Sequence, residues 1–249
     1  MRTLGPLFLM ASLGLLLGCQ EVLLPEEPGE GPVTNFEFAW AEVDRHYSFF
    51  DVKEIDWEEI RAFYRPWIDA TSTPADLFSI LSEMLGRLED GHVGLVSPFA
   101  TYRYSGWYAA HPHNFHFDLI WRSLLQGQGR TPSGQIFFGW ITPDIGYIHL
   151  PTFTGSNWAA EIDDVLEILE QASALVLDVR DNSGGNDGNA ERIAGRFTED
   201  RRLYRRIQYR NGPAHSDFTA PMDDYLEPTG KRQFLGPVAV LTNRRTFSA

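Results

Sequence analysis

Apolar positions near the N-terminal end of the globular region recur with helical spacing. From Asn35 onward they fall three or four residues apart, which predicts an amphipathic helix. The stripe consists of Phe36, Trp40, Val43, Tyr47 and Phe50. A second helix is predicted to begin at Asp56, whose side chain can cap it, with Glu59 in the capping-box position.

The start of a third helix is predicted by a compact local signal. Thr73 can serve as N-cap, Pro74 suits the first helical position, and Asp76 occupies the capping-box position. The helix is predicted to end at Asp90-Gly91, and residues 92–96 are predicted to form a short strand. Residues 34–98 are therefore predicted to be a helical N-terminal subdomain.

Downstream of residue 135 the pattern changes to strands alternating with helices. The predicted strands are residues 136–141 and 145–150 as a hairpin, 203–209, and the buried strands 174–179 and 237–241. One helix is predicted to be capped by Ser156 or Asn157, and another to contain Ala190, Ile193 and Phe197. This order predicts an α/β layer over residues 136–249, whereas residues 99–135 lack sustained periodicity and are predicted to be an irregular connection.

The first 18 residues have the pattern of an export signal. Arg2 precedes an apolar run, Leu7–Leu17, that is shorter than the roughly 20 residues a membrane span needs. The ending Leu16-Leu17-Gly18-Cys19 resembles a bacterial lipobox, in which the cysteine is acylated and becomes the mature N-terminus. An ordinary secretion signal is the alternative. We expect lipidation at Cys19, a tether over residues 19–33, and a location in the cell envelope, on the periplasmic face or outer surface of a bacterial membrane.

Composition narrows the possible functions. The chain of 249 residues is 43% hydrophobic and 13% aromatic, which is typical of a globular protein. Its net charge of −13 argues against nucleic-acid binding, because a negative surface repels phosphates. Since Cys19 is the single cysteine, intrachain disulfides and cysteine-built zinc sites are excluded.

Two polar segments contain residue types that often bind nucleotides or metal ions. The loop Asp181–Gly188 contains neither a dinucleotide fingerprint nor a P-loop, and Arg192 stands where a calcium loop needs glutamate. A metal-hydrolase alternative rests on three histidines that could hold zinc, although Phe115 stands where such a motif needs an acid. These histidines are His111, His113 and His116. We expect a surface loop there, and no metal or organic cofactor.

Ser248 and His92 are the candidates for nucleophilic catalysis. Ser248 follows a predicted strand through a tight turn, where a helix start would favour a developing oxyanion. A serine needs a base, and His92 lies in a glycine-flanked turn between helix and strand. On these residues alone, a helix-capping serine and a turn histidine explain the pattern better.

Four motifs together resemble a known family. They are Leu88-Glu89-Asp90-Gly91-His92, Gly146–Phe153, Asp178–Asn186 and Thr246-Phe247-Ser248-Ala249. In this order they resemble the C-terminal processing peptidases and tricorn-core serine peptidases, and the resemblance runs from about Asn35 to Ala249. It implies a ClpP/crotonase-like α/β core after the helical subdomain, a peptide or protein substrate, and serine endopeptidase activity. The export signal at residues 1–19 leads us to expect that this activity is outside the cytoplasm.

The resemblance also implies residue roles. Ser248 would be the nucleophile, and backbone N–H groups of Gly184 or Gly185 and of Ala249 would form the oxyanion hole. His92 would be the base, as in tricorn-like members. The branch with a PDZ domain uses a lysine after the serine instead. Here there is no PDZ-sized insert, and the lysines of the chain, Lys53 and Lys231, both precede Ser248.

One departure from the family affects what we expect of this chain. Members continue after the serine with an acidic residue, a helix and further strands, whereas this sequence ends at Ala249. We therefore expect a core that is incomplete at its C-terminus, and a chain that is poorly stable and inactive on its own. The alternative function is a non-catalytic ligand- or peptide-binding lipoprotein on the same fold.

Overall fold

The computed structural model describes residues 29–111 and 113–249, which form two compact units. The first unit contains the described residues up to Tyr104 together with Arg210–Asp217, and the second contains Ser105–Tyr209 and Phe218–Ala249. The predicted signal peptide, Cys19 and most of the predicted tether lie outside the described residues. Within the described ranges, no helix is long and apolar enough to cross a membrane.

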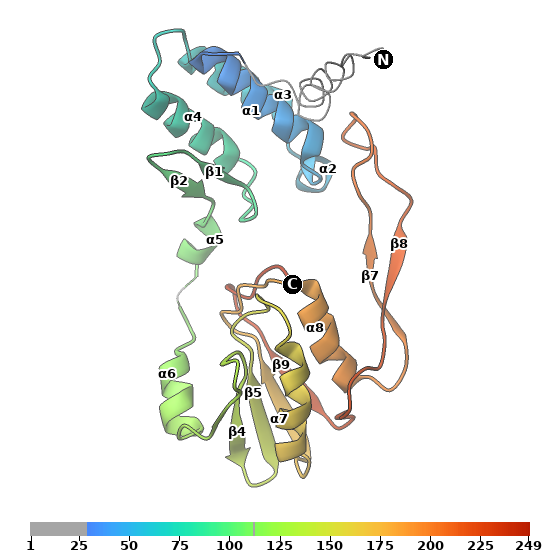
Figure 1. The fold of residues 1–249 in the computed structure, drawn as a ribbon. Coiled ribbons are helices and arrows are strands. Elements are labelled where there is room, and N and C mark those ends of the chain that lie inside the picture. The colour runs from blue at the N-terminus through green and yellow to red at the C-terminus, as the bar shows by residue number, and fades with distance from the viewer. Residues whose placement is uncertain (1–28, 112) are drawn as a thin grey trace, which may run out of the picture. The chain divides into compact units, whose positions relative to one another are not determined.

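The first unit is a set of helices followed by a hairpin (Figure 1). Its elements are α1 (Pro32–His46), α2 (Phe50–Lys53), α3 (Trp57–Tyr64), the 3-10 turn Arg65–Trp67, α4 (Pro74–Gly86), β1 (Gly94–Val96) and β2 (Thr101–Arg103). Helices α1 and α3 both contact α4. Their shared core consists of the buried side chains of Phe36, Phe50, Trp57, Tyr64, Ile68, Leu81, Met84, Leu85 and Leu88.

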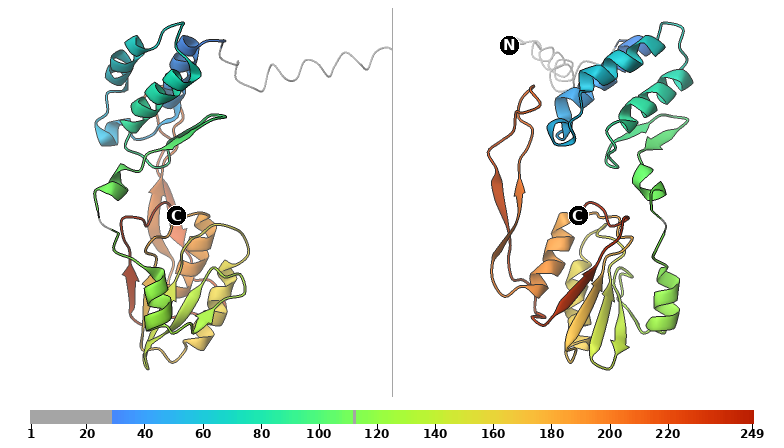
Figure 2. Two further views of the ribbon diagram at one scale, coloured as in Figure 1. Left: turned by 90° about the vertical axis from the view of Figure 1, so that its left-hand side faces the viewer. Right: turned by 180° about the vertical axis from the view of Figure 1, so that it is seen from behind.

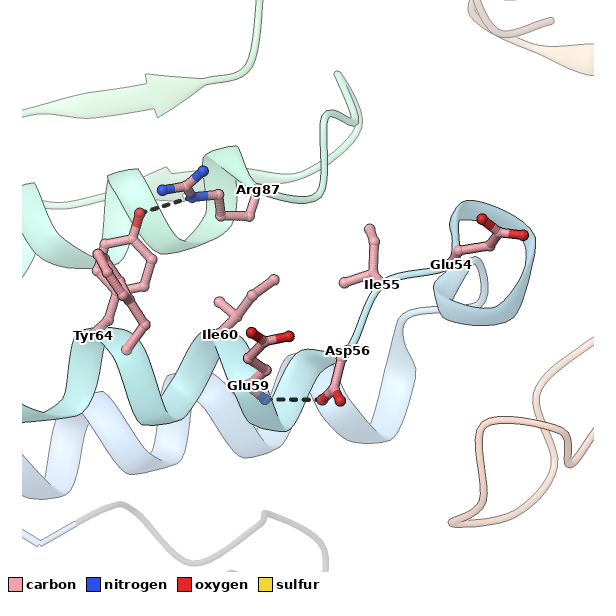
Figure 3. A pocket seen from close by; sticks show the side chains of 8 residues that line it. Glu54, Ile55, Asp56, Glu59, Ile60, Tyr64 and Arg87 are labelled. Carbon is pink, nitrogen blue, oxygen red and sulfur yellow. Dashed lines mark hydrogen bonds between the residues drawn. The ribbon is translucent and has the colours of Figure 1, made fainter.

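Local capping places these helices largely as the sequence predicts. The side chain of Asp56 accepts the backbone N–H of Glu59 at 2.9 Å, and Thr73 and Asp76 form a complete capping box. Arg87 Nε donates to Tyr64 Oη at 3.0 Å, and both residues line a cavity of 360 Å³. Figure 3 shows this hydrogen bond and the Asp56 cap. The first helix is shorter than predicted, because it ends at His46 and the chain turns before α2.

The second unit is built on one mixed sheet with the strand order β3-β4-β5-β6-β9. The strands are β3 (Gly129–Arg130), β4 (Phe137–Thr142), β5 (Ile145–His149), β6 (Ala174–Asp178) and β9 (Val238–Leu241). The pairs β3-β4 and β4-β5 are antiparallel, and β5-β6 and β6-β9 are parallel. The predicted hairpin and the strand from Ala174 are confirmed.

Helices cover one face of this sheet (Figures 1 and 2). They are α7 (Ile162–Ile168), entered through the 3-10 turn Ala159–Glu161, and α8 (Asp187–Ala194), which continues as the 3-10 turn Gly195–Phe197. Ile148 and Leu175 of the sheet pack against Ile162 and Ile193 in this core. The side chains of Tyr147 and His149 point to the opposite face, because side chains alternate along a strand.

The first part of the second unit, from Ser105 to Arg130, contains short elements rather than one regular structure. They are α5 (Gly106–Ala109), α6 (Phe117–Leu119), the π-helical turn Ile120–Leu124 and β3. Phe117 stacks on His149 with ring centroids 4.7 Å apart, so this segment covers the sheet face opposite α7 and α8.

Three details of the second unit differ from the sequence prediction. The α7 helix is not capped by Ser156 or Asn157: Asn157 has a φ of 68°, and the helix starts through the 3-10 turn instead. Strand β9 is not buried on both faces, since the Val240 side chain is 58% exposed at the edge of the sheet. The hairpin of β7 (Arg202–Ile207) with β8 (Met222–Leu226) includes a strand that the apolar pattern did not predict.

Candidate active site

The C-terminal end of β6 is fixed by a buried carboxylate. Asp178 is fully buried and accepts hydrogen bonds from Tyr147 Oη at 2.5 Å and from Arg180 N and Nε at 2.9 Å. Burial alone would raise the pKa of this carboxyl, but the bonds from Arg180 and Tyr147 outweigh it and lower the pKa. Asp178 is therefore ionised at neutral pH and holds the chain where the glycine loop begins.

The glycine loop is shaped by a buried asparagine. Asn182 donates from Nδ2 to the carbonyl of Leu150 at 2.9 Å, and its Oδ1 accepts the backbone N–H of Gly184 at 2.7 Å. The carbonyl of Gly184 accepts the N–H of Phe153 at 2.8 Å. These bonds hold Gly184 at a φ of 79° and Gly185 at 142°, a region that favours glycine.

Ser248 lies on a turn that is bonded to this loop. Phe247 N donates to the carbonyl of Asn182 at 3.0 Å, and Thr246 Oγ1 donates to the carbonyl of Val179 at 2.8 Å. Asn243 Nδ2 also donates to Asp181 Oδ1 at 2.7 Å. Ser248 itself is exposed and has a φ of 65°, which is uncommon for a residue other than glycine.

The serine and the glycine loop are in close contact. A Cβ atom placed on Gly184 would lie 2.6 Å from Ser248 Cβ and 3.0 Å from Ala249 N. Only glycine fits there, so the loop packs directly beneath the Ser248–Ala249 peptide. The structure thus brings Ser248 and Ala249 against Gly184.

The two glycines differ in the availability of their N–H groups. Gly184 is buried and its N–H is bonded to Asn182. Gly185 is exposed, and its N–H donates no hydrogen bond to the part of the chain that the structure describes. Of the pair, Gly185 is therefore the residue with a donor that can face a ligand.

A cavity of 310 Å³ adjoins Ser248 and Ala249. Its apolar wall consists of Ala190, Ala194 and Leu226, with Tyr204 and Arg205 beside them. Arg205 is neutralised by Asp187, Glu191 and Asp224, whose oxygens lie 2.7 to 3.2 Å from its nitrogens. The cavity can accommodate an apolar side chain next to the serine.

His92 belongs to the first unit, whereas Ser248 and the glycines belong to the second. Its backbone N–H donates to Asp90 Oδ1 at 2.9 Å, and its Nδ1 lies 3.3 Å from the same oxygen. The side chain of His92 is 59% exposed, so the imidazole is accessible. Sequence reasoning selected His92 but missed Asp90, although Asp-x-His is a spacing at which a carboxylate can reach both groups.

The histidine-rich segment is organised differently from a metal site. His113 Nε2 is bonded to Asp181 Oδ2 at 2.8 Å, and the rings of His113 and His116 meet edge to face at 5.0 Å. Among the described residues, no group of three or more His, Cys, Asp or Glu side chains is arranged to hold a metal ion. The alternative based on His111, His113 and His116 therefore lacks a ligand set in that part of the chain.

Comparisons with known proteins agree with the sequence motifs. The model of peptidase family S41 matches residues 144–249, and that of the tricorn protease C1 domain matches residues 31–86. A comparison with proteins of curated function found no match.

Solved structures resemble the chain over most of its length. A crystal structure of a protein from Parabacteroides merdae, described as a candidate peptidase, is 35% identical with a TM-score of 0.80, covering 87% of this chain and 69% of that one. Mature CPAF complexed with lactacystin has the same fold, with a TM-score of 0.60 and 10% identity over 86% of this chain and 80% of that one. A second structure of mature CPAF has a TM-score of 0.60 and 10% identity, covering 88% of this chain and 79% of that one. On these motifs and matches, the chain belongs to peptidase family S41.

Proposed function

We propose that the protein is a serine endopeptidase that cleaves peptides or unfolded proteins, with Ser248 as nucleophile and His92 as base. The observation that carries the proposal is the packing of Gly184 against the Ser248–Ala249 peptide, with Ser248 exposed at a left-handed φ. A structural serine has no need of this conformation, whereas a nucleophile must present its hydroxyl next to backbone donors.

Each group has a defined task in this reaction. Ser248 Oγ attacks the scissile carbonyl while His92 takes its proton, and the N–H groups of Gly185 and Ala249 bind the oxyanion. Collapse of the tetrahedral intermediate breaks the C–N bond, and His92 returns the proton to the leaving amine. Water then hydrolyses the acyl-enzyme by the same steps. In this scheme Gly184 shapes the loop rather than donating, because its N–H is bonded to Asn182.

The cavity beside Ser248 supports a preference for apolar substrate side chains. Ala190, Ala194 and Leu226 offer apolar surface, and Arg205 has no spare charge for a substrate carboxylate because three acidic residues neutralise it. We place the side chain that precedes the scissile bond in this cavity.

We further propose that the enzyme is exported and anchored to a membrane through a lipid on Cys19. The support is the sequence of residues 1–19, in which an apolar run ends at Gly18-Cys19. Peptides or unfolded proteins outside the cytoplasm would then be its substrates. Radiolabelled palmitate incorporation that is lost in Cys19→Ala tests this part alone.

The catalytic proposal is tested by hydrolysis of casein and of fluorogenic peptides by the full-length protein, which here means the full product of the gene with any residues that follow Ala249 included. Ser248→Ala and His92→Ala should each lower kcat/KM by roughly 10⁴-fold, while Ser156→Ala, an exposed serine of the same unit, should change it less than twofold. Full activity in Ser248→Ala would refute the assignment of the nucleophile. A wild-type protein that cleaves no peptide and reacts with no fluorophosphonate would favour a non-catalytic binding protein on the same fold.

A further inference from the structure

Asp90 lies in a position to orient the proposed base. Its side chain is 13% exposed and follows α4 in the turn that leads to His92. Oδ1 accepts the backbone N–H of His92 at 2.9 Å and lies 3.3 Å from His92 Nδ1. One carboxylate oxygen thus contacts both the backbone and the ring of the same histidine.

The carboxylate of Asp90 is itself held in place. Tyr47 Oη donates to Asp90 Oδ2 at 3.0 Å, which occupies the second oxygen. Lys53 Nζ donates to the carbonyls of Leu88 at 2.6 Å and Glu89 at 3.1 Å, which anchors the turn before Asp90. Rotation of the carboxylate would break the Tyr47 bond, so its orientation toward His92 is fixed by groups outside the turn.

The charge state of Asp90 suits this task. Burial tends to raise the pKa of the carboxyl, but bonds from His92 N and Tyr47, with the charge of Lys53, lower it overall. The pKa of Tyr47 is raised, first by burial and then by Asp90, so Tyr47 stays a donor. Asp90 is therefore an ionised acceptor at neutral pH.

We propose that Asp90 is a positioning residue for His92, with Tyr47 supporting it. The inference rests on the proposed role of His92 as the base. Asp90 keeps the proton of the neutral imidazole on Nδ1 and leaves the lone pair on Nε2, and its charge stabilises the imidazolium that forms when Ser248 is deprotonated. The carboxylate that orients the base then lies two residues before it, in the first unit.

The test combines kinetics with the protonation pattern of the ring. In the full-length protein, Asp90→Ala should lower kcat by about 10³-fold or more with KM within threefold, because the Asp90 side chain is 13% exposed and acts through His92. Tyr47→Phe should lower kcat by roughly tenfold. Asp44→Asn is the control. It removes the charge of another Asp–His pair in the same unit, in which His215 Nε2 lies 2.7 Å from Asp44 Oδ1. This substitution should change kcat less than twofold.

Nitrogen-15 NMR of the imidazole supplies a readout that a purely structural role would not move. Wild-type His92 should carry its proton on Nδ1, and Asp90→Ala should shift the population to the Nε2–H form. If Asp90→Ala distorts the turn, Asp90→Asn gives the same test, since it removes the charge at constant size and should lower kcat at least tenfold. An unchanged tautomer in Asp90→Ala, or a kcat within threefold of wild type, would overturn the proposal. If His92→Ala is as active as wild type, the proposed role of His92 as the base is refuted. A comparison of the His92 tautomer in wild type and Asp90→Ala then still shows whether Asp90 positions the ring.

Discussion

Substitution of Asp178 tests how strongly its buried carboxylate stabilises the end of β6 and the glycine loop that follows it. Asp178→Asn keeps the volume but removes the charge that accepts bonds from Tyr147 and from Arg180. Breaking a buried ion pair costs about 3 to 5 kcal/mol. Because the Arg180 side chain is 21% exposed and can recover some hydration, we expect the lower end, about 3 kcal/mol.

Hydrogen exchange of the β6 amides measures this loss directly. A loss of about 3 kcal/mol lowers the protection of amides that exchange by global opening of the second unit by roughly 150-fold. The matched control is Asp164→Asn, an exposed aspartate of α7, which should change stability by about 0.5 kcal/mol or less. A loss below about 1 kcal/mol for Asp178→Asn, or one equal to the control, would refute the reasoning.

The same residue gives a signed pH dependence. The pKa of Asp178 is lower in the folded state than its ordinary value of 3.8, so its stabilisation is fully present above that value. It is lost as pH falls through the folded pKa. The difference in unfolding free energy between wild type and Asp178→Asn should therefore be constant from pH 5 to 7 and shrink below about pH 4.

Two further predictions concern the surroundings of Ser248. Gly184→Ala should lower kcat/KM by about 100-fold or more, because its Cβ would lie 2.6 Å from Ser248 Cβ at a φ of 79°. The control is Gly188→Ala, whose Cβ would meet only a side-chain oxygen of Asn186 at 3.2 Å. Equal activity of the two variants would contradict the packing of Gly184 against Ser248. Ala194→Phe should fill the 310 Å³ cavity and lower kcat/KM for peptides with a large apolar residue before the scissile bond by roughly tenfold or more, while labelling by a small fluorophosphonate changes little. Ala160→Phe, at an exposed position, should leave both assays unchanged, and an equal effect of the two substitutions would exclude the cavity as the substrate site.

Local signals predicted where α3 and α4 begin, but not where α1 and α4 end, at His46 and Gly86. The Thr73 cap could be predicted because its partner Asp76 lies in the same turn, so the cap needs only local contacts. Asn157 shows the opposite case: its residue type suits a cap, but the chain enters α7 through a 3-10 turn that begins after Trp158, which is buried in the core. Sequence alone does not reveal that packing.

Strands at the edges were harder to predict than the central one. Strand β8 carries Asp223 and Asp224, which pair with Arg206 and Arg205 across the hairpin. Charge pairs, rather than apolar alternation, hold it, so the pattern gave no signal. For β9 the apolar run was read correctly as a strand, but such a run does not specify whether both of its faces are covered.

The sequence motifs single out the residues of the candidate site, but they do not reveal the contacts that distinguish the roles of these residues. The motifs indicated Ser248 and the glycine pair, and the structure places Gly184 beneath the serine. In the structure, Asn182 accepts the N–H of Gly184, while Gly185 is exposed. This difference arises because the loop folds around the buried Asn182 side chain, which the motifs do not reveal. The support of His92 by Asp90 and Tyr47 likewise needs a contact between residues 43 positions apart.

The central claim is that Ser248 is an activated nucleophile. The most direct measurement is mass spectrometry of the full-length protein after reaction with a fluorophosphonate, with the modified residue located by peptide mapping. The account predicts about one adduct per chain, on Ser248, and greatly slowed labelling in His92→Ala. An adduct on a different serine, or none under conditions that label other serine hydrolases completely, would contradict it.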